Sequence, residues 1–374
     1  MDIVILSDEG KSLDLAVKMR AAGHSVALWV KNKNFDTVGG GMVNVLPVWE
    51  PTNADLYLLD SPNLSELEFK LTARGSKFLA ISEAGRLMQE PFARWQRLAS
   101  ASVPMPPTTV AYLSEINQPP EGQSLVHFVK PFAEPRLVSK ADWPKLKQSF
   151  PADQEIAVVV APEGPRAEAL GLVHHGKLVE GSCVIITSRT GWSFSLPAPW
   201  HVQELLRLLA PKMPHTYSGP LALQLIFTEL GWITLEFLIG WPWELLPHLM
   251  RSIKEDAKFV LDRLAAKEEF AVTSNGRMTF LQQIVASETF EASKRGAILP
   301  NLAKGMPAVY HPMNVYREEG FYKFAGTSRY LGAWTFSGFA VDEIIEATKL
   351  PEPQRHRITT VISERMQLLT QKVA

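Results

Sequence analysis

The sequence predicts an α/β region at the N-terminus, followed by α+β regions. Over residues 1–103, short apolar strands alternate with amphipathic helices, which is typical of a parallel sheet. Residues 103–107, Val-Pro-Met-Pro-Pro, then interrupt regular structure, because proline restricts the backbone and lacks an N–H donor. After this boundary, apolar strands follow one another in pairs, which is typical of antiparallel hairpins.

Composition and charge exclude several classes of protein. A chain of 374 residues is long enough for several domains, and its 46% apolar and 21% charged fractions are those of a soluble globular protein. The net charge of −1 gives no bulk attraction for nucleic acid. Cys183 is the single cysteine, which excludes an intramolecular disulfide and a cysteine-based metal site. We see no signal peptide and no apolar run of roughly 18 residues. We therefore expect a cytoplasmic protein with no membrane segment.

The N-terminal region should hold its ligand at one edge of the sheet. Ligands of parallel sheets bind where the strands end. The turn over residues 8–12, Asp-Glu-Gly-Lys-Ser, lies at such an end, but it lacks the glycines of a dinucleotide-binding or P-loop motif. We interpret it as a strand-to-helix turn that could also contact a ligand. The predicted strands are 3–6, 24–30, 56–59 and 77–81, and the helices 13–22, 64–73 and 86–101.

The remaining chain is predicted to contain hairpins and three helices. Antiparallel pairs are expected at residues 169–173 with 178–187, and at 221–228 with 232–238. From about residue 279, strands alternate with turns. The other predicted strands are 125–130 and 155–161, and the helices are 202–209, 245–266 and one from about residue 356.

One carboxylate lies where its neighbours indicate a core. Residues 231–244 read GWITLEFLIGWPWE, with Glu236 inside an apolar strand and Glu244 after Trp-Pro-Trp. Burying a carboxylate is unfavourable unless it is paired or bound to a cation. The local pattern leaves two interpretations open. Glu236 faces water from a strand, or it is a metal ligand at a nucleotide site.

Four stretches, in order along the chain, resemble one family. Residues 190–199, TGWSFSLPAP, are similar to its Gly-Gly-Met-Gly-Ala-Tyr-Ser-Pro-Ala-Pro segment. Residues 219–237 resemble a strand pair ending in Glu-Phe-Asn, and residues 240–244 resemble Gly-Asp-Pro-Glu. Residues 308–311 and 326–338 resemble Ala-Val-Phe-His and Gly-Gly-Arg-Val-Leu segments. The family is phosphoribosylamine–glycine ligase, of the ATP-grasp superfamily, and the resemblance runs along the full chain.

The resemblance implies an ATP-grasp fold in four parts. These are an N-terminal Rossmann-like domain (1–103), a small ATP-grasp subdomain (104–187), a central ATP-grasp domain (188–275) and a C-terminal antiparallel domain (276–374). The two middle parts would enclose a nucleotide cleft. The implied reaction uses ATP and magnesium to convert a carboxylate into an acyl phosphate, which an amine then attacks. The implied substrates are a small amino acid such as glycine and an amine or phosphosugar amine.

The same resemblance implies roles for particular residues. Magnesium prefers oxygen ligands, chiefly carboxylates. Glu236, with Gln224, would hold the metal, and Glu236 and Arg329 would be catalytic. The implied nucleotide-binding residues are Lys130, Arg94, Glu163, Gln224 and Glu236, and the implied substrate-binding residues are Gly191, Ser195, Arg295 and Arg329.

The sequence also departs from the family at the nucleotide site. Leu238 replaces the metal-binding Asn, and neutral Gln224 replaces an acid. The segment after Lys130 has two prolines and no glycine, so it offers fewer backbone N–H donors to phosphates. We therefore expect weak or single-metal nucleotide binding. Three functions remain open: a working ligase, a relative with changed chemistry, and a non-catalytic binding or scaffold protein.

Overall fold

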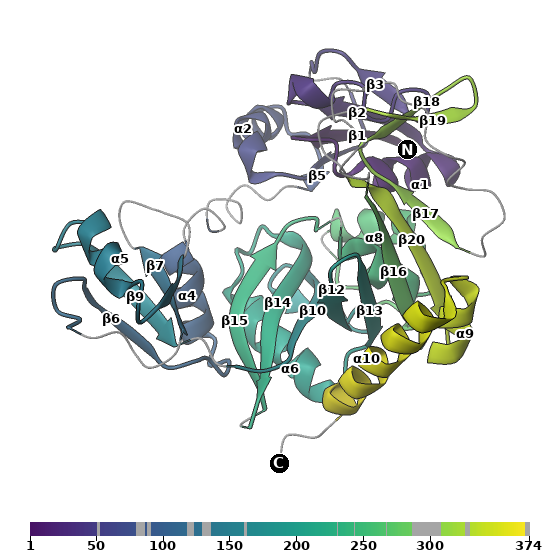
Figure 1. Cartoon of the computed structure of the whole chain (residues 1–374). Coiled ribbons are helices and arrows are strands. Elements are labelled where there is room, and N and C mark those ends of the chain that lie inside the picture. The colour runs from purple at the N-terminus through teal and green to yellow at the C-terminus, as the bar shows by residue number, and fades with distance from the viewer. Residues whose placement is uncertain are drawn as a thin grey trace.

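The computed structural model describes residues 1–50, 53–79, 87, 91–117, 123–128, 136–160, 163–229, 231–242, 244–266, 268–285, 308–325 and 330–370. The strands of these residues form a five-stranded, a four-stranded and a nine-stranded sheet, with a separate two-stranded ribbon (Figure 1). The nine-stranded sheet is the body of the molecule. The other two sheets lie at different ends of it.

The five-stranded sheet is parallel, as the sequence predicts, with strand order β3-β2-β1-β4-β5. Its central strands are buried on both faces, because α1 packs on one side and α2 on the other. The bounds are β1 Asp2–Ser7, β2 Ser25–Val30, β3 Asn44–Leu46, β4 Leu56–Leu59, β5 Phe78–Leu79, α1 Leu13–Ala21, α2 Ser65–Ala73, and the 3-10 helices η1 Lys33–Phe35 and η2 Pro62–Leu64.

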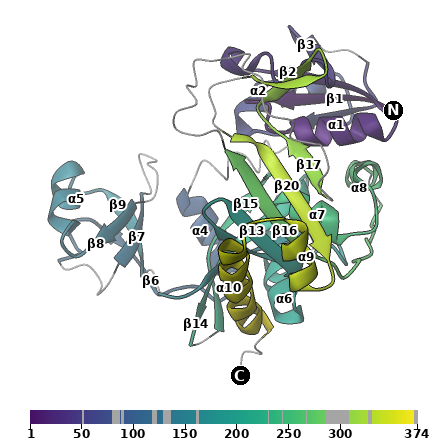
Figure 2. The ribbon, with the colours of Figure 1, turned by 45° about the vertical axis from the view of Figure 1, so that its right-hand side comes forward.

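The four-stranded antiparallel sheet, with order β6-β9-β7-β8, projects from the body together with α5 (Figures 1 and 2). It has a small core of its own, in which Phe128, Trp143 and Ile156 are buried. Helix α4 lies between this sheet and the body, with contacts to both β7 and β15. The bounds are β6 Thr108–Tyr112, β7 Gln123–Phe128, β8 Arg136–Ser139, β9 Glu155–Val160, α4 Pro91–Ser100 and α5 Trp143–Ser149.

The nine-stranded sheet collects strands from three of the four predicted parts. Its main order is β15-β14-β10-β12-β13-β16-β20-β17, and β11 pairs with β10. Segment 104–187, assigned above to one subdomain, divides between this sheet and the four-stranded one. The bounds are β10 Arg166–His174, β11 Lys177–Leu178, β12 Val184–Arg189, β13 Trp192–Pro197, β14 Ser218–Thr228, β15 Gly231–Ile239, β16 Met278–Val285, β17 Val309–Pro312 and β20 Tyr330–Gly338.

Helices cover both faces of the nine-stranded sheet. Helix α6 packs on one face, and α7 and α8 pack on the other. Helices α9 and α10 cover β13, β16 and β20 through a core that includes Phe194, Phe280 and Phe336. A ribbon of β18 and β19 reaches back to the N-terminal region, where the Arg317 N–H donates to the Gly40 carbonyl at 2.8 Å. The bounds are α6 Trp200–Leu209, η3 Ala210–Lys212, α7 Leu246–Ser252, α8 Ala257–Leu264, α9 Val341–Ala347, α10 Glu352–Thr370, β18 Val315–Glu318 and β19 Phe321–Phe324.

Three predictions of element boundaries are wrong. The helix predicted at 245–266 is two helices, because Ile253 is extended and Asp256 caps α8 by accepting from the Phe259 N–H at 2.8 Å. The strand predicted at 178–187 is interrupted after β11, where the Ser182 hydroxyl accepts from the Leu172 N–H. The last helix begins at Glu352, earlier than predicted, and α9 before it was not predicted at all.

Candidate functional site

A row of polar side chains crosses three neighbouring strands of the body. Glu168 on β10 lies directly opposite Gln224 on β14, which lies directly opposite Glu236 on β15. Residues opposite one another across antiparallel strands point to the same face. The three side chains, which we call the polar row, therefore share the face that also carries α7. Two of the three, Gln224 and Glu236, are residues that the resemblance assigned to metal and nucleotide.

An irregularity in β15 brings Glu236 into this row. Gln224 pairs with Glu236 but Leu225 pairs with Thr234, so Leu235 is left without a partner. With strict alternation, Glu236 would share the face of Thr234, which is fully buried on the other side of the sheet. The extra residue turns Glu236 to the opposite face, as β-bulges do. An acid in an apolar strand is therefore explained by a bulge, which the sequence pattern does not reveal.

Glu236 forms an ion pair with a residue that the sequence also assigned to the nucleotide. Arg94, on α4, places its Nη2 atom 2.7 Å from Oε1 of Glu236. The Arg94 side chain is 9% exposed and the Glu236 side chain 19%, so the pair is largely removed from water. Two charges in such surroundings stabilise each other, and each would be costly alone. The structure therefore brings together two predicted cofactor-binding residues, but as partners of one another.

Two neighbouring acids, Glu168 and Glu244, lie at the other end of the polar row. Burial and the neighbouring Glu244 carboxylate raise the pKa of Glu168, whereas a hydrogen bond from the Ser188 hydroxyl lowers it. Burial also raises the pKa of Glu244, and the Lys11 ammonium acts against that rise. Lys11 belongs to the turn over residues 8–12, so this turn does approach the polar row. Glu244 also helps to raise the pKa of Tyr330, after burial.

The described residues that the resemblance assigned to the metal do not fit a magnesium site. In the part of the chain that the structure describes, no group of three or more acids, histidines or cysteines is arranged to hold a metal. Glu236 is neutralised by Arg94, and Gln224 carries no charge. Leu238 packs against the apolar core beneath α7 and α8. A hard divalent ion requires oxygen ligands, chiefly carboxylates, that are not already paired with a guanidinium.

Ser195 has a structural partner. It is buried on β13, and its hydroxyl lies 2.8 Å from Nδ1 of His248 on α7. The Ser193 hydroxyl lies 2.7 Å from Nε2 of the same ring. Burial, and to a lesser extent His311, lowers the pKa of His248 to about 3. The neutral ring thus joins α7 to β13, and the structure does not bring Ser195 to a surface where substrate could bind.

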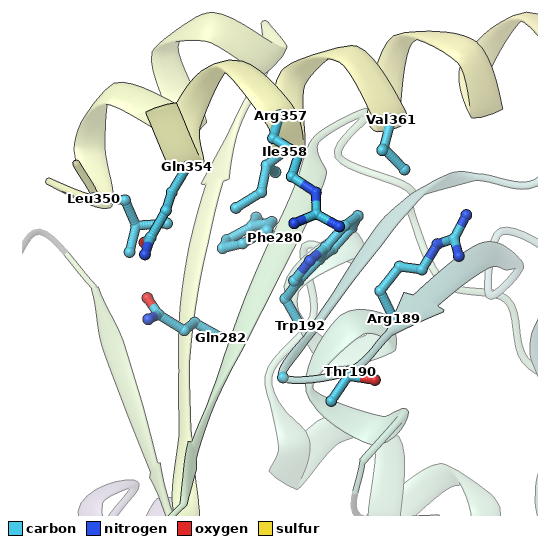
Figure 3. A pocket seen from close by; sticks show the side chains of 11 residues that line it. Arg189, Thr190, Trp192, Phe280, Gln282, Leu350, Gln354, Arg357, Ile358 and Val361 are labelled. Atoms are coloured by element: carbon cyan, nitrogen blue, oxygen red, sulfur yellow. The ribbon is translucent and has the colours of Figure 1, made fainter. Parts of the chain in front are cut away.

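The other predicted residues are dispersed. Gly191 lies at the β12–β13 turn, where it lines a pocket on the face of the sheet opposite the polar row (Figure 3). Glu163 is exposed just before β10. Lys130, Arg295 and Arg329 lie outside the described residues. Their assignments stay predictions.

The segment at residues 308–311, part of the family resemblance, joins the N-terminal region to the body. His311 Nδ1 lies 3.0 Å from Oδ2 of Asp14 and 2.8 Å from the Lys18 ammonium, both on α1. Its Nε2 lies 2.8 Å from the Thr335 hydroxyl on β20. Burial by itself would raise the pKa of Asp14, but Lys18 and His311 outweigh it and lower that pKa to about 2. The resemblance here corresponds to a buried polar contact between two regions.

Comparison with solved structures identifies the fold. Phosphoribosylamine–glycine ligase from Thermotoga maritima superposes with a TM-score of 0.64 at 13% identity, over 94% of this chain and 96% of that one. The biotin carboxylase domain of 2-oxoglutarate carboxylase from Hydrogenobacter thermophilus, in complex with MgADP, ADP and bicarbonate, gives a TM-score of 0.67 at 13% identity, over 93% and 88%. An L-amino acid ligase from Bacillus licheniformis gives 0.61 at 12% identity, over 92% and 95%.

These likenesses establish an ATP-grasp fold along almost the whole chain. No family model and no curated protein sequence matches it. Within the described residues, every helix is too short or too polar to cross a membrane.

Proposed function

We propose that this chain, which has the ATP-grasp fold, is an ATP-dependent carboxylate–amine ligase whose reaction takes place beside the polar row. The nucleoside triphosphate would activate a small carboxylate as an acyl phosphate, and an amine would displace the phosphate. The observation that carries the proposal is the polar row itself. Three neighbouring strands direct Glu168, Gln224 and Glu236 to one face. The similarity to three carboxylate-activating enzymes supports the same reaction class.

The charges of the site suggest a role in the reaction for each of its residues. Arg94 supplies a fixed positive charge next to Glu236, and Lys11 supplies another near Glu244. An attacking amine must lose a proton, and a carboxylate with a raised pKa is suited to receive it. We assign that role to Glu168, which carries such a shift. No step is assigned to a magnesium ion, because the described residues do not form its site.

The Arg94–Glu236 pair also favours a second candidate. A protein that kept the ATP-grasp fold as a binding module would have no need of a metal ligand at Glu236. It could instead use that carboxylate to fasten α4 to β15. Leu238 packed in the apolar core is consistent with this alternative. The second candidate is therefore a non-catalytic or chemically changed protein that binds a nucleotide or another small molecule.

Measurements of ATP binding and of phosphate release distinguish the ligase from the non-catalytic binding protein. Calorimetry with ATP, with and without magnesium, measures binding, and phosphate release with amino acids and amines measures turnover. A ligase should bind ATP and release phosphate only when both a carboxylate and an amine are present. Glu168→Gln should then abolish turnover while ATP binding is retained.

The matched control is Glu204→Gln on α6, which changes an exposed acid away from the polar row and should preserve turnover. Nucleotide binding without turnover in the wild type would support the binding module instead. If ATP does not bind at all, the ligase proposal is rejected.

A further inference from the structure

The pocket at the β12–β13 turn is separate from the polar row. Its volume is about 630 Å³, within the range of small-molecule sites. It lies between this turn, β16 and α10 (Figure 3). Trp192 and Gln282, which pair across β13 and β16, contribute to its lining. Because side chains alternate along a strand, Trp192 points away from the face that carries Ser193, Ser195 and the polar row. We call this cavity the hairpin pocket.

One side of the hairpin pocket is formed by the ring of Trp192, which stacks on the buried Phe280. The rings of Trp192 and Phe280 lie 5.7 Å apart with an angle of 30° between their planes. Ile358 on α10 contributes an apolar side chain to the lining, and Phe280 and Ile358 are both buried. Such a surface favours a flat ring, because stacking removes from water the face of the ligand ring and the face of Trp192 that contact each other.

Among the described residues that line it, the same pocket has two arginines and no acid. Arg189 on β12 and Arg357 on α10 both line it, whereas none of its other described lining residues is an aspartate or glutamate. Figure 3 shows the Arg357 guanidinium next to Trp192 and the Arg189 guanidinium beyond that ring, with Gln282 and Gln354 on the opposite side of Trp192. Among the described residues, neither arginine forms an ion pair. Two uncompensated guanidinium groups favour an oxyanion, which they can bind through paired hydrogen bonds.

We propose that the hairpin pocket binds a small molecule in which a phosphate or carboxylate is attached to a flat ring. The oxyanion lies between Arg189 and Arg357. The ring lies against Trp192, and the amides of Gln282 and Gln354 contact polar groups at its far edge. The site is independent of the proposed ligase reaction, since it lies on the other face of the sheet.

Equilibrium dialysis with probes that absorb ultraviolet light tests this site. The probes are 4-nitrophenyl phosphate and 4-nitrobenzoate, which join an oxyanion to a flat ring, and 4-nitrobenzyl alcohol, which has the ring without the charge. We expect at least one charged probe to bind, and the neutral one to bind about tenfold more weakly or worse. The tighter of the two charged probes identifies the oxyanion. Absence of binding by both, or equal binding of the neutral probe, overturns the proposal.

Variants of the pocket locate the bound probe. Arg189→Gln and Arg357→Gln should each weaken the tighter probe about tenfold, because each removes charge-assisted hydrogen bonds. Trp192→Leu should weaken the ring-bearing probe more than inorganic phosphate. Arg207→Gln on α6 is the control, because it removes an exposed arginine outside the pocket. Unchanged binding in the Arg189→Gln/Arg357→Gln double variant would assign the probe to another site and reject this one. Both arginines are exposed, so folding of the variants is expected and is checked by circular dichroism.

Discussion

Among single residues, Arg94 and Glu236 have the largest influence on what the polar row can bind. Their ion pair fixes α4 against β15 and leaves the row with one fewer available carboxylate. A divalent ion would have to displace a guanidinium that is itself largely shielded from water. For the nucleotide binding proposed above, the pair predicts a weak dependence on magnesium.

The ion pair also predicts a strong coupling in stability. Arg94→Met should lower the free energy of unfolding by about 3 kcal/mol, because it leaves a largely buried carboxylate without its guanidinium. Urea denaturation of Arg94→Met, Glu236→Gln and the double variant measures the coupling. In the Glu236→Gln background, Arg94→Met should lower the free energy of unfolding by a much smaller amount. If Arg94→Met lowers the free energy of unfolding equally in both backgrounds, the ion pair does not contribute to stability.

His248 predicts a loss of stability in mild acid. Its pKa is lowered from the ordinary 6.5 to about 3 in the folded protein, so the unfolded chain takes up the proton first. This contribution is complete above pH 6.5 and is lost as the pH falls from there towards 3. For one such group, the free energy of unfolding changes by about 1.4 kcal/mol per pH unit.

Chemical denaturation of wild type and His248→Gln between pH 7 and pH 5 measures this slope, in a range above the ordinary pKa of carboxylates. The glutamine variant should be less stable at pH 7, but its stability should change less with pH. An identical pH slope in the two proteins would exclude His248 as the source.

At the scale of elements, the sequence predicts what depends on local patterns and misses what depends on contacts. The parallel strands and the β14–β15 hairpin follow from apolar runs and turn residues, and they are confirmed. The bulge at Leu235 depends on how β15 pairs with β14, and the pairing of Glu236 with Arg94 joins residues far apart in the chain. No local pattern encodes either. Asp256 was a missed signal, since aspartate before an apolar run is a common helix N-cap.

For the whole molecule, the attachment of the four-stranded sheet is the main feature that local patterns do not predict. Two backbone hydrogen bonds hold the chain where it enters and leaves this sheet. The Thr234 N–H donates to the Pro104 carbonyl, and the Phe227 N–H donates to the Pro165 carbonyl, both at 2.8 Å. Both contacts are made to the β14–β15 hairpin.

Gly164 allows the close approach of the Pro165 and Phe227 segments. Adding a methyl group at this position, in Gly164→Ala, should therefore disturb their hydrogen bond. A Cβ atom at this position would lie 2.1 Å from the Phe227 carbonyl oxygen, so Gly164→Ala must push the two segments apart. We expect faster hydrogen exchange at the Phe227 amide, with the five-stranded sheet unaffected. Gly75→Ala is the control, because its Cβ would meet nothing within 4 Å although its φ of +66° brings backbone strain. Unchanged exchange at Phe227 in Gly164→Ala would contradict this account.

The two attachments limit how the smaller sheet can move. Because the four-stranded sheet is attached at two points, it can rotate easily only about the axis that joins them. Sliding or twisting of the four-stranded sheet would have to break one of the two backbone hydrogen bonds, whereas rotation about the Pro104–Pro165 line would preserve both. Any rotation of the four-stranded sheet relative to the body should therefore follow a single arc that is fixed by β14 and β15.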